Sequence, residues 1–60
     1  MPKKILVADD EPDIRTTLGA VLKGSGYDVD EAVNGKDCLD KISREKYDLL
    51  ILDLIMPKMD

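Results

Sequence analysis

Two short runs of apolar residues are the clearest pattern along the chain. They occupy residues 5–8 and residues 49–52, and charged residues flank both of them. Continuous apolar runs of this length are typical of strands that are buried on both faces of a parallel sheet. Both runs end at carboxylates, the first at Asp9 and Asp10 and the second at Asp53.

The rest of the pattern predicts one further strand and two helices. Residues 27–32 fit an edge strand, because acidic and apolar residues alternate there. Apolar residues recur at helical spacing from Pro12 to about residue 24, and Asn34 can cap a second helix. The apolar positions are Ile14, Leu18, Val21 and Leu22 in the first helix, and Cys38, Leu39 and Ile42 in the second.

The predicted order is strand, helix, strand, helix, strand, which indicates an α/β fold with a parallel sheet. If strand one lies in the middle, the strand order is 2-1-3, and right-handed crossovers then place the two helices on opposite faces. This order resembles that of half of a flavodoxin-like doubly wound sheet, in which ligands bind where the strand order reverses. We therefore expect a single domain over residues 1–60, with Asp9, Asp10 and Asp53 at one end of its sheet.

Composition and charge argue against several kinds of partner. Lys and Arg number 9 against 13 Asp and Glu, a net charge of -4, whereas nucleic-acid binding needs clustered positive charge. No apolar run approaches the roughly 20 residues of a membrane span. Cys38 is the single cysteine, so we expect a buried, inert thiol in a reducing compartment. These features predict a cytoplasmic protein that binds neither nucleic acid nor membrane.

Three carboxylates in one pocket repel one another unless a cation neutralises them. Mg²⁺ suits such a set, since it prefers oxygen ligands and is typically held by carboxylates together with a phosphate. Asp53 is the candidate nucleophile, because it ends a buried strand and a metal ion can shield the charge of a phosphoryl group. Each residue alone also fits a simpler role, Asp9 and Asp10 as helix-start acids and Asp53 as a solvated strand end.

Residues 7–12 (VADDEP) and 52–60 (LDLIMPKMD) resemble the motifs of receiver domains of two-component response regulators, and the resemblance spans the whole chain. It implies that Asp53 accepts a phosphoryl group from a partner histidine kinase. It also implies that Asp10 and Asp53 bind Mg²⁺ directly, that Asp9 helps through water, and that the backbone carbonyl of Ile55 is a further ligand. Such a receiver is phosphorylated and is not an enzyme.

Compared with that family, residues 1–60 correspond to a truncated receiver domain, its first half. Receivers continue with further βα units that supply a hydroxyl-bearing switch residue and a lysine that contacts the phosphoryl group. Lys58 is not expected to replace that lysine, because it projects from a different loop. From this half alone we expect weak Mg²⁺ binding, poor labelling of Asp53 and impaired switching.

A third strand without its outer neighbour would expose an apolar edge with unpaired backbone groups. We expect two copies to pair there as a homodimer, with antiparallel third strands about a two-fold axis and one continuous six-stranded sheet. A self-associating structural unit without phosphotransfer activity is the alternative function. A phosphohydrolase of the haloacid dehalogenase type is disfavoured, because it needs a second Asp two residues after the nucleophile, where this chain has Ile55.

Overall fold

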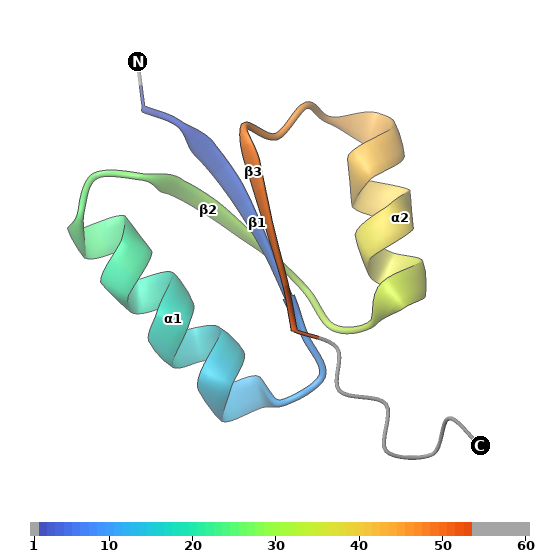
Figure 1. Ribbon diagram of the computed structural model, residues 1–60, viewed down its shortest axis with the longest axis horizontal. Helices are drawn as coiled ribbons and strands as arrows, with labels where there is room; N and C mark the ends of the chain where they lie inside the picture. Colours follow the sequence, from blue (N-terminus) through green and yellow to red (C-terminus); the bar gives the residue numbers. More distant parts are fainter. Residues whose placement is uncertain (1, 54–60) are drawn as a thin grey trace.

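The computed structural model describes residues 2–53, with Asp53 described by its backbone alone. The strands and helices of this part of the chain follow one another in the predicted order (Figure 1). They are β1 (Lys4–Asp9), α1 (Pro12–Gly24), β2 (Asp28–Ala32), α2 (Gly35–Arg44) and β3 (Leu49–Asp53). The predicted elements are therefore confirmed, with small differences at their ends.

The strands form one parallel sheet in the order β2-β1-β3, as predicted. β1 is the middle strand and pairs with β2 over residues 4–8. Its pairing with β3 runs from Ile5 opposite Leu49 to Asp9 opposite Asp53. The carboxyl ends of β1 and β3 therefore lie side by side, at the end of the sheet where α1 begins (Figure 1).

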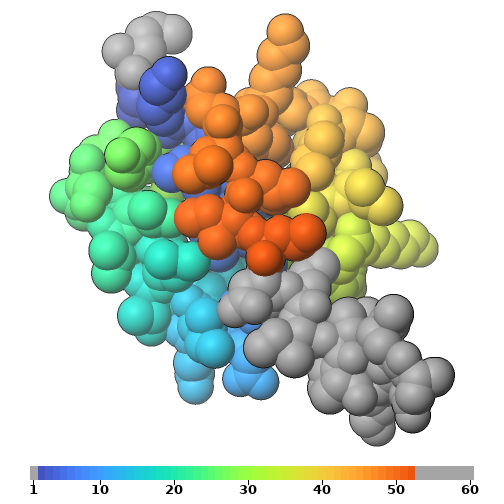
Figure 2. Space-filling view, viewed as in Figure 1, coloured from blue at the N-terminus to red at the C-terminus, as the bar shows by residue number. Residues whose placement is uncertain are grey.

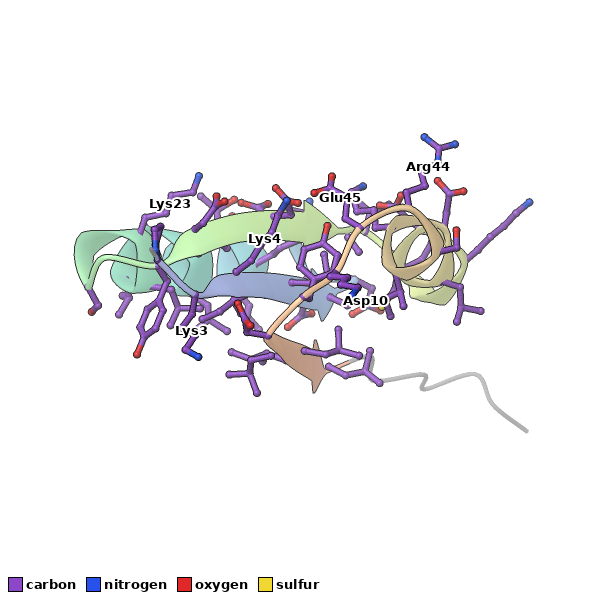
Figure 3. All side chains as sticks on the ribbon, turned by 90° about the horizontal axis from the view of Figure 1, so that it is seen from above. Lys3, Lys4, Asp10, Lys23, Arg44 and Glu45 are labelled. Carbon is purple, nitrogen blue, oxygen red and sulfur yellow. The ribbon has the colours of Figure 1, made fainter. Side chains whose placement is uncertain are left out.

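Two small hydrophobic cores lie on the two faces of the sheet, because successive side chains of a strand point to opposite faces. The α1 side holds Ile5, Val7 and Val29, against which Leu18, Leu22 and Ile51 pack. The α2 side holds Leu6, Ala8, Ala32 and Cys38, against which Tyr47 packs. The helices thus cover opposite faces (Figure 3), as right-handed crossovers require. Cys38 is buried, as predicted.

The prediction that β3 is buried on both faces is wrong for the described chain. Leu49, Leu50 and Leu52 are between 40% and 58% exposed, and β3 has no neighbour other than β1 within residues 2–53. Figure 2 looks onto this edge, where the side chains of β3 (orange) fill the front of the molecule between α1 and α2. The apolar run is exposed because no described element covers it, which agrees with the expected apolar edge.

Several apolar helix positions are also more exposed than their spacing predicts. Leu18, Leu22 and Cys38 pack on the sheet, but the other members of the apolar set are exposed. The exposed positions are Ile14 and Val21 in α1 and Leu39 and Ile42 in α2. A three-stranded sheet is too narrow to cover all the apolar surface of both helices. Within residues 2–53, neither helix has the length and apolar composition that a membrane span needs.

Polar side chains connect the loop before β3 to the start of β1 through an ion pair and hydrogen bonds (Figure 3). The Lys4 ammonium pairs with the Glu45 carboxylate and lies 3.9 Å from Oδ2 of Asp30. The Tyr47 hydroxyl donates a hydrogen bond to the same Asp30 oxygen at 2.7 Å. Burial, and then this bond, raise the pKa of Tyr47, so the hydroxyl keeps its proton. These contacts fix where β3 begins, at the opposite end of the sheet from Asp9.

A side-chain cap begins α2, as predicted. Oδ1 of Asn34 accepts a hydrogen bond from the backbone N–H of Asp37 at 2.7 Å, and the Asp37 carboxylate accepts one from the N–H of Val33 at 3.0 Å. These bonds satisfy backbone donors that the start of a helix leaves unpaired. The bond from Val33, and next the ion pair with Lys41, lower the pKa of Asp37.

Replacing Asn34 with alanine is expected to lower the free energy of unfolding by about 1 kcal/mol, because the Asp37 N–H loses its acceptor. Urea unfolding followed by circular dichroism measures this change. Asn34→Ser is the matched control, since serine keeps an acceptor, and its stability should stay close to that of the wild type. An alanine variant as stable as the serine variant would contradict the role of the cap.

Candidate functional site

Asp9 and Asp53 are the last residues of two neighbouring strands. They are register partners in the parallel pairing of β1 and β3, and neighbouring strands lie about 4.8 Å apart. The prediction that these residues meet at one end of the sheet is therefore confirmed for their backbones. The side chain of Asp53 lies outside the described part of the chain, and so does Ile55, whose carbonyl is a predicted Mg²⁺ ligand.

Asp9 is only 3% exposed, although it lies at the end of a strand. Its Oδ1 accepts a hydrogen bond from the backbone N–H of Glu11 at 2.9 Å. An aspartate that binds the N–H two residues ahead forms a local turn. This bond therefore determines how the chain leaves β1 and enters α1 at Pro12.

Asp10 follows β1 directly and is exposed (Figure 3). Among residues 2–53, none donates a hydrogen bond to its carboxylate or pairs with it as an ion. The acid in the first turn of α1 is Asp13, and the N-cap is Glu11. Asp10 directly precedes the N-cap, and its carboxylate is exposed and accessible to a cation.

Arg15 is a residue of this site that sequence reasoning missed. Its Nη1 donates a hydrogen bond to the backbone carbonyl of Asp9 at 2.8 Å, and its Nε donates one to Oε1 of Glu31 at 3.1 Å. The three residues come from α1, β1 and β2. No spacing pattern connects them, because helical and strand periodicities show which face a residue occupies and not which neighbour it meets.

The donor set at this end of the sheet consists of carboxylates. No group of three carboxylate, histidine or cysteine side chains that could hold a metal is present among those the structure describes, which exclude Asp53. Asp9 and Asp10 supply oxygen donors, and the chain contains no histidine. Oxygen donors suit Mg²⁺ better than they suit a softer ion. The Mg²⁺ site stays a prediction that the chemistry of Asp9 and Asp10 fits.

Asp9 and Asp53 lie at the carboxyl ends of neighbouring strands, where the strand order of the open parallel sheet reverses. This is the place where α/β proteins of this class bind their ligands. The family model of the response regulator receiver domain matches residues 5–60. This chain belongs to the response regulator receiver domain family. The resemblance noted from the two motifs is therefore confirmed.

A solved structure agrees with this assignment. The crystal structure of response regulator protein TrrA from Thermotoga maritima, in complex with Mg²⁺-BeF, matches the fold with a TM-score of 0.86 and 48% sequence identity. The match covers 97% of this chain and 50% of that chain. The fold described above is therefore that of one part of a response regulator structure.

Curated relatives also match this whole chain with only part of their own length. The alkaline phosphatase synthesis transcriptional regulatory protein PhoP of Bacillus subtilis is 52% identical over 60 residues, which are 100% of this chain and 25% of that protein. Sporulation initiation phosphotransferase F of Bacillus subtilis is 42% identical over 60 residues, which are 100% of this chain and 48% of that protein. The chain thus spans half or less of the length of these relatives.

Proposed function

We propose that this chain is the phosphoacceptor part of a receiver in a two-component signalling system. In this proposal Asp53 accepts a phosphoryl group from the phosphohistidine of a partner histidine kinase, and Asp9, Asp10, Asp53 and the carbonyl of Ile55 hold Mg²⁺. The observation that carries the proposal is the pairing of Asp9 with Asp53 at the carboxyl ends of adjacent strands. The complex of TrrA with Mg²⁺-BeF supports it.

The proposed reaction is a nucleophilic substitution at phosphorus. A carboxylate oxygen of Asp53 attacks the phosphorus atom, the bond from phosphorus to the imidazole nitrogen of the donor breaks, and the released imidazole takes up a proton. The product is an acyl phosphate on Asp53. Bound Mg²⁺ supplies the positive charge that offsets the carboxylates and the phosphoryl oxygens. The chain is modified in this step and does not act as an enzyme.

The same proposal places the protein in the cytoplasm, in contact with its kinase and with no nucleic acid or membrane. Two observations support this placement. The single cysteine, Cys38, is a buried free thiol, as expected in a reducing compartment. The net charge of -4 disfavours binding to the phosphate backbone of a nucleic acid.

Added Mg²⁺ is expected to stabilise the wild-type chain and to lose this effect in Asp53→Asn. At a Mg²⁺ concentration about ten times the dissociation constant, the free energy of unfolding should rise by about 1.4 kcal/mol. Urea unfolding with and without MgCl₂, at constant ionic strength, measures the difference. Asn keeps the size of the side chain and removes the charge that a metal needs.

The matched control for that experiment is Asp40→Asn, which removes a carboxylate from α2, where Asp40 pairs with Arg44. This variant should keep the full response to Mg²⁺. Equal stabilisation of the wild type and Asp53→Asn by Mg²⁺ would contradict the proposed metal site. A wild type whose free energy of unfolding does not change with Mg²⁺ would contradict it too.

A second function is favoured by the exposed edge of β3, namely self-association. Three leucines of β3 are exposed at this edge, and α1 and α2 also carry exposed apolar side chains. The matched proteins are about twice as long as this chain or longer. For this chain by itself, a second copy is the partner that we propose covers the β3 edge. Two β3 edges that meet about a two-fold axis run antiparallel, which gives a homodimer with one six-stranded sheet.

A further inference from the structure

The guanidinium of Arg15 connects the end of β1 to β2. One of its nitrogens, Nη1, donates to the Asp9 carbonyl, and another, Nε, donates to the Glu31 carboxylate. The side chain of Arg15 is only 14% exposed. A planar guanidinium presents its donors in a fixed fork, so holding two acceptors on two strands determines where each acceptor lies.

Gly19 makes room for the Glu31 carboxylate. Position 19 lies one helical turn after Arg15 in α1, on the same side of the helix. A Cβ atom at Gly19 would come within 3.2 Å of Oε2 of Glu31, closer than ordinary van der Waals contact. The ion pair between Arg15 and Glu31 therefore sits in a space that the glycine leaves open between α1 and β2.

The pairing with Glu31 also matters for charge. An unpaired arginine beside Asp9 would repel a divalent cation. Because the positive charge of Arg15 is offset by Glu31 at 3.1 Å, the arginine can hold the backbone of Asp9 with little net charge next to the acidic site.

The segment from Asp9 to Glu11 is held at two points. Arg15 holds the carbonyl of Asp9, and the carboxylate of Asp9 holds the N–H of Glu11. Asp10 lies between these two points, with its carboxylate exposed. The backbone on both sides of Asp10 is therefore fixed, which limits where that carboxylate can be.

We propose that Arg15 is a positioning residue of the acidic site, which acts through the backbone carbonyl of Asp9 and is itself oriented by Glu31. This inference rests on the proposed Mg²⁺ site and adds two residues to it. Arg15 does not touch the ion. It fixes the turn that carries Asp9 and Asp10, in the way that outer partners of metal ligands set the ligands' geometry.

The test compares Mg²⁺ affinity in the wild type, Arg15→Lys and Glu31→Gln. Titration with MgCl₂ at constant ionic strength, followed through the amide NMR signals of Asp10 and Glu11, measures the dissociation constant. Arg15→Lys keeps the charge but loses the fork, and Mg²⁺ binding should weaken roughly tenfold, within the range seen when an outer partner of a ligand is removed. Glu31→Gln should weaken binding in the same direction, because it removes the negative charge that offsets Arg15 and leaves the arginine to repel the cation.

Arg44→Gln is the matched control. It removes an exposed arginine that pairs with Asp40 on α2 and that points away from the sheet (Figure 3). Its Mg²⁺ affinity should stay within about twofold of the wild type, because screening by salt weakens distant charges. A dispersed NMR spectrum without metal establishes that each variant is folded.

The separation of affinity from stability decides the inference. One outcome is that the Arg15→Lys and Glu31→Gln variants lose stability in urea and still bind Mg²⁺ with wild-type affinity. That result would show that the ion pair only stabilises the fold, and it would leave the proposed function intact. A wild-type chain whose Asp10 and Glu11 signals do not respond to Mg²⁺ would overturn both proposals. A roughly tenfold loss in Arg15→Lys and a loss in the same direction in Glu31→Gln, with Arg44→Gln unchanged, support the positioning role.

Discussion

Replacing Leu6 with alanine is expected to remove most of the stability of this chain. Leu6 is fully buried at the centre of the core on the α2 side, and truncation of a buried leucine costs about 2–5 kcal/mol. At about 0.05–0.15 kcal/mol per residue, a domain of this size has roughly 3–9 kcal/mol in total. The cost is therefore comparable with the whole free energy of unfolding.

Urea unfolding at 25 °C, followed by circular dichroism, measures this loss. Leu39→Ala is the matched control, because Leu39 is 70% exposed, and its cost should stay within about 0.5 kcal/mol. The measurement is repeated at several protein concentrations, since dimerisation would raise the apparent stability as concentration rises. A Leu6→Ala variant as stable as Leu39→Ala would contradict the core described above.

Introducing lysine at Leu50 and Leu52 is expected to convert a dimer into a monomer. Both leucines lie on the exposed strand β3. In a two-fold dimer, the lysines of the two copies would lie near one another on paired strands. Lysines on an edge strand oppose pairing with another edge, and like charges across paired strands are unfavourable. The dissociation constant should rise by at least about tenfold, because each 1.4 kcal/mol lost is a factor of ten.

Light scattering measures the molar mass, which should be twice the 6.7 kDa of the chain for the wild type and 6.7 kDa for the double variant. Ala20→Lys is the matched control, since it adds a lysine at an exposed position of α1, and it should remain a dimer. A monomeric wild type with a folded circular dichroism spectrum would rule out self-association through β3.

The local pattern was enough to predict the fold. Strand-length apolar runs alternate with stretches of helical spacing, which predicts a parallel sheet. With the first strand in the middle, right-handed connections place the two helices on opposite faces. The same reasoning places Asp9 and Asp53 at one end of the sheet, because both follow apolar runs directly. Asn34 was identified as a cap from its residue type and its place before a helix.

Burial could not be predicted as well. The run at residues 49–52 looks like a strand covered on both faces, yet its leucines are exposed. An apolar run shows that a segment favours burial, but whether it is covered depends on which other elements reach it. The same holds for Val21 and Leu39, whose spacing fits a core face that the narrow sheet does not cover.

The amino-acid sequence by itself determined the order of elements, the parallel sheet and the meeting of the strand ends at Asp9 and Asp53, because these follow from local periodicity and the handedness of the chain. Only the tertiary structure decided that Arg15 holds the Asp9 carbonyl with Glu31 as its partner, and that Val21 and Leu39 lie outside the core. Contacts between side chains on different elements depend on packing distances, which residue spacing does not contain.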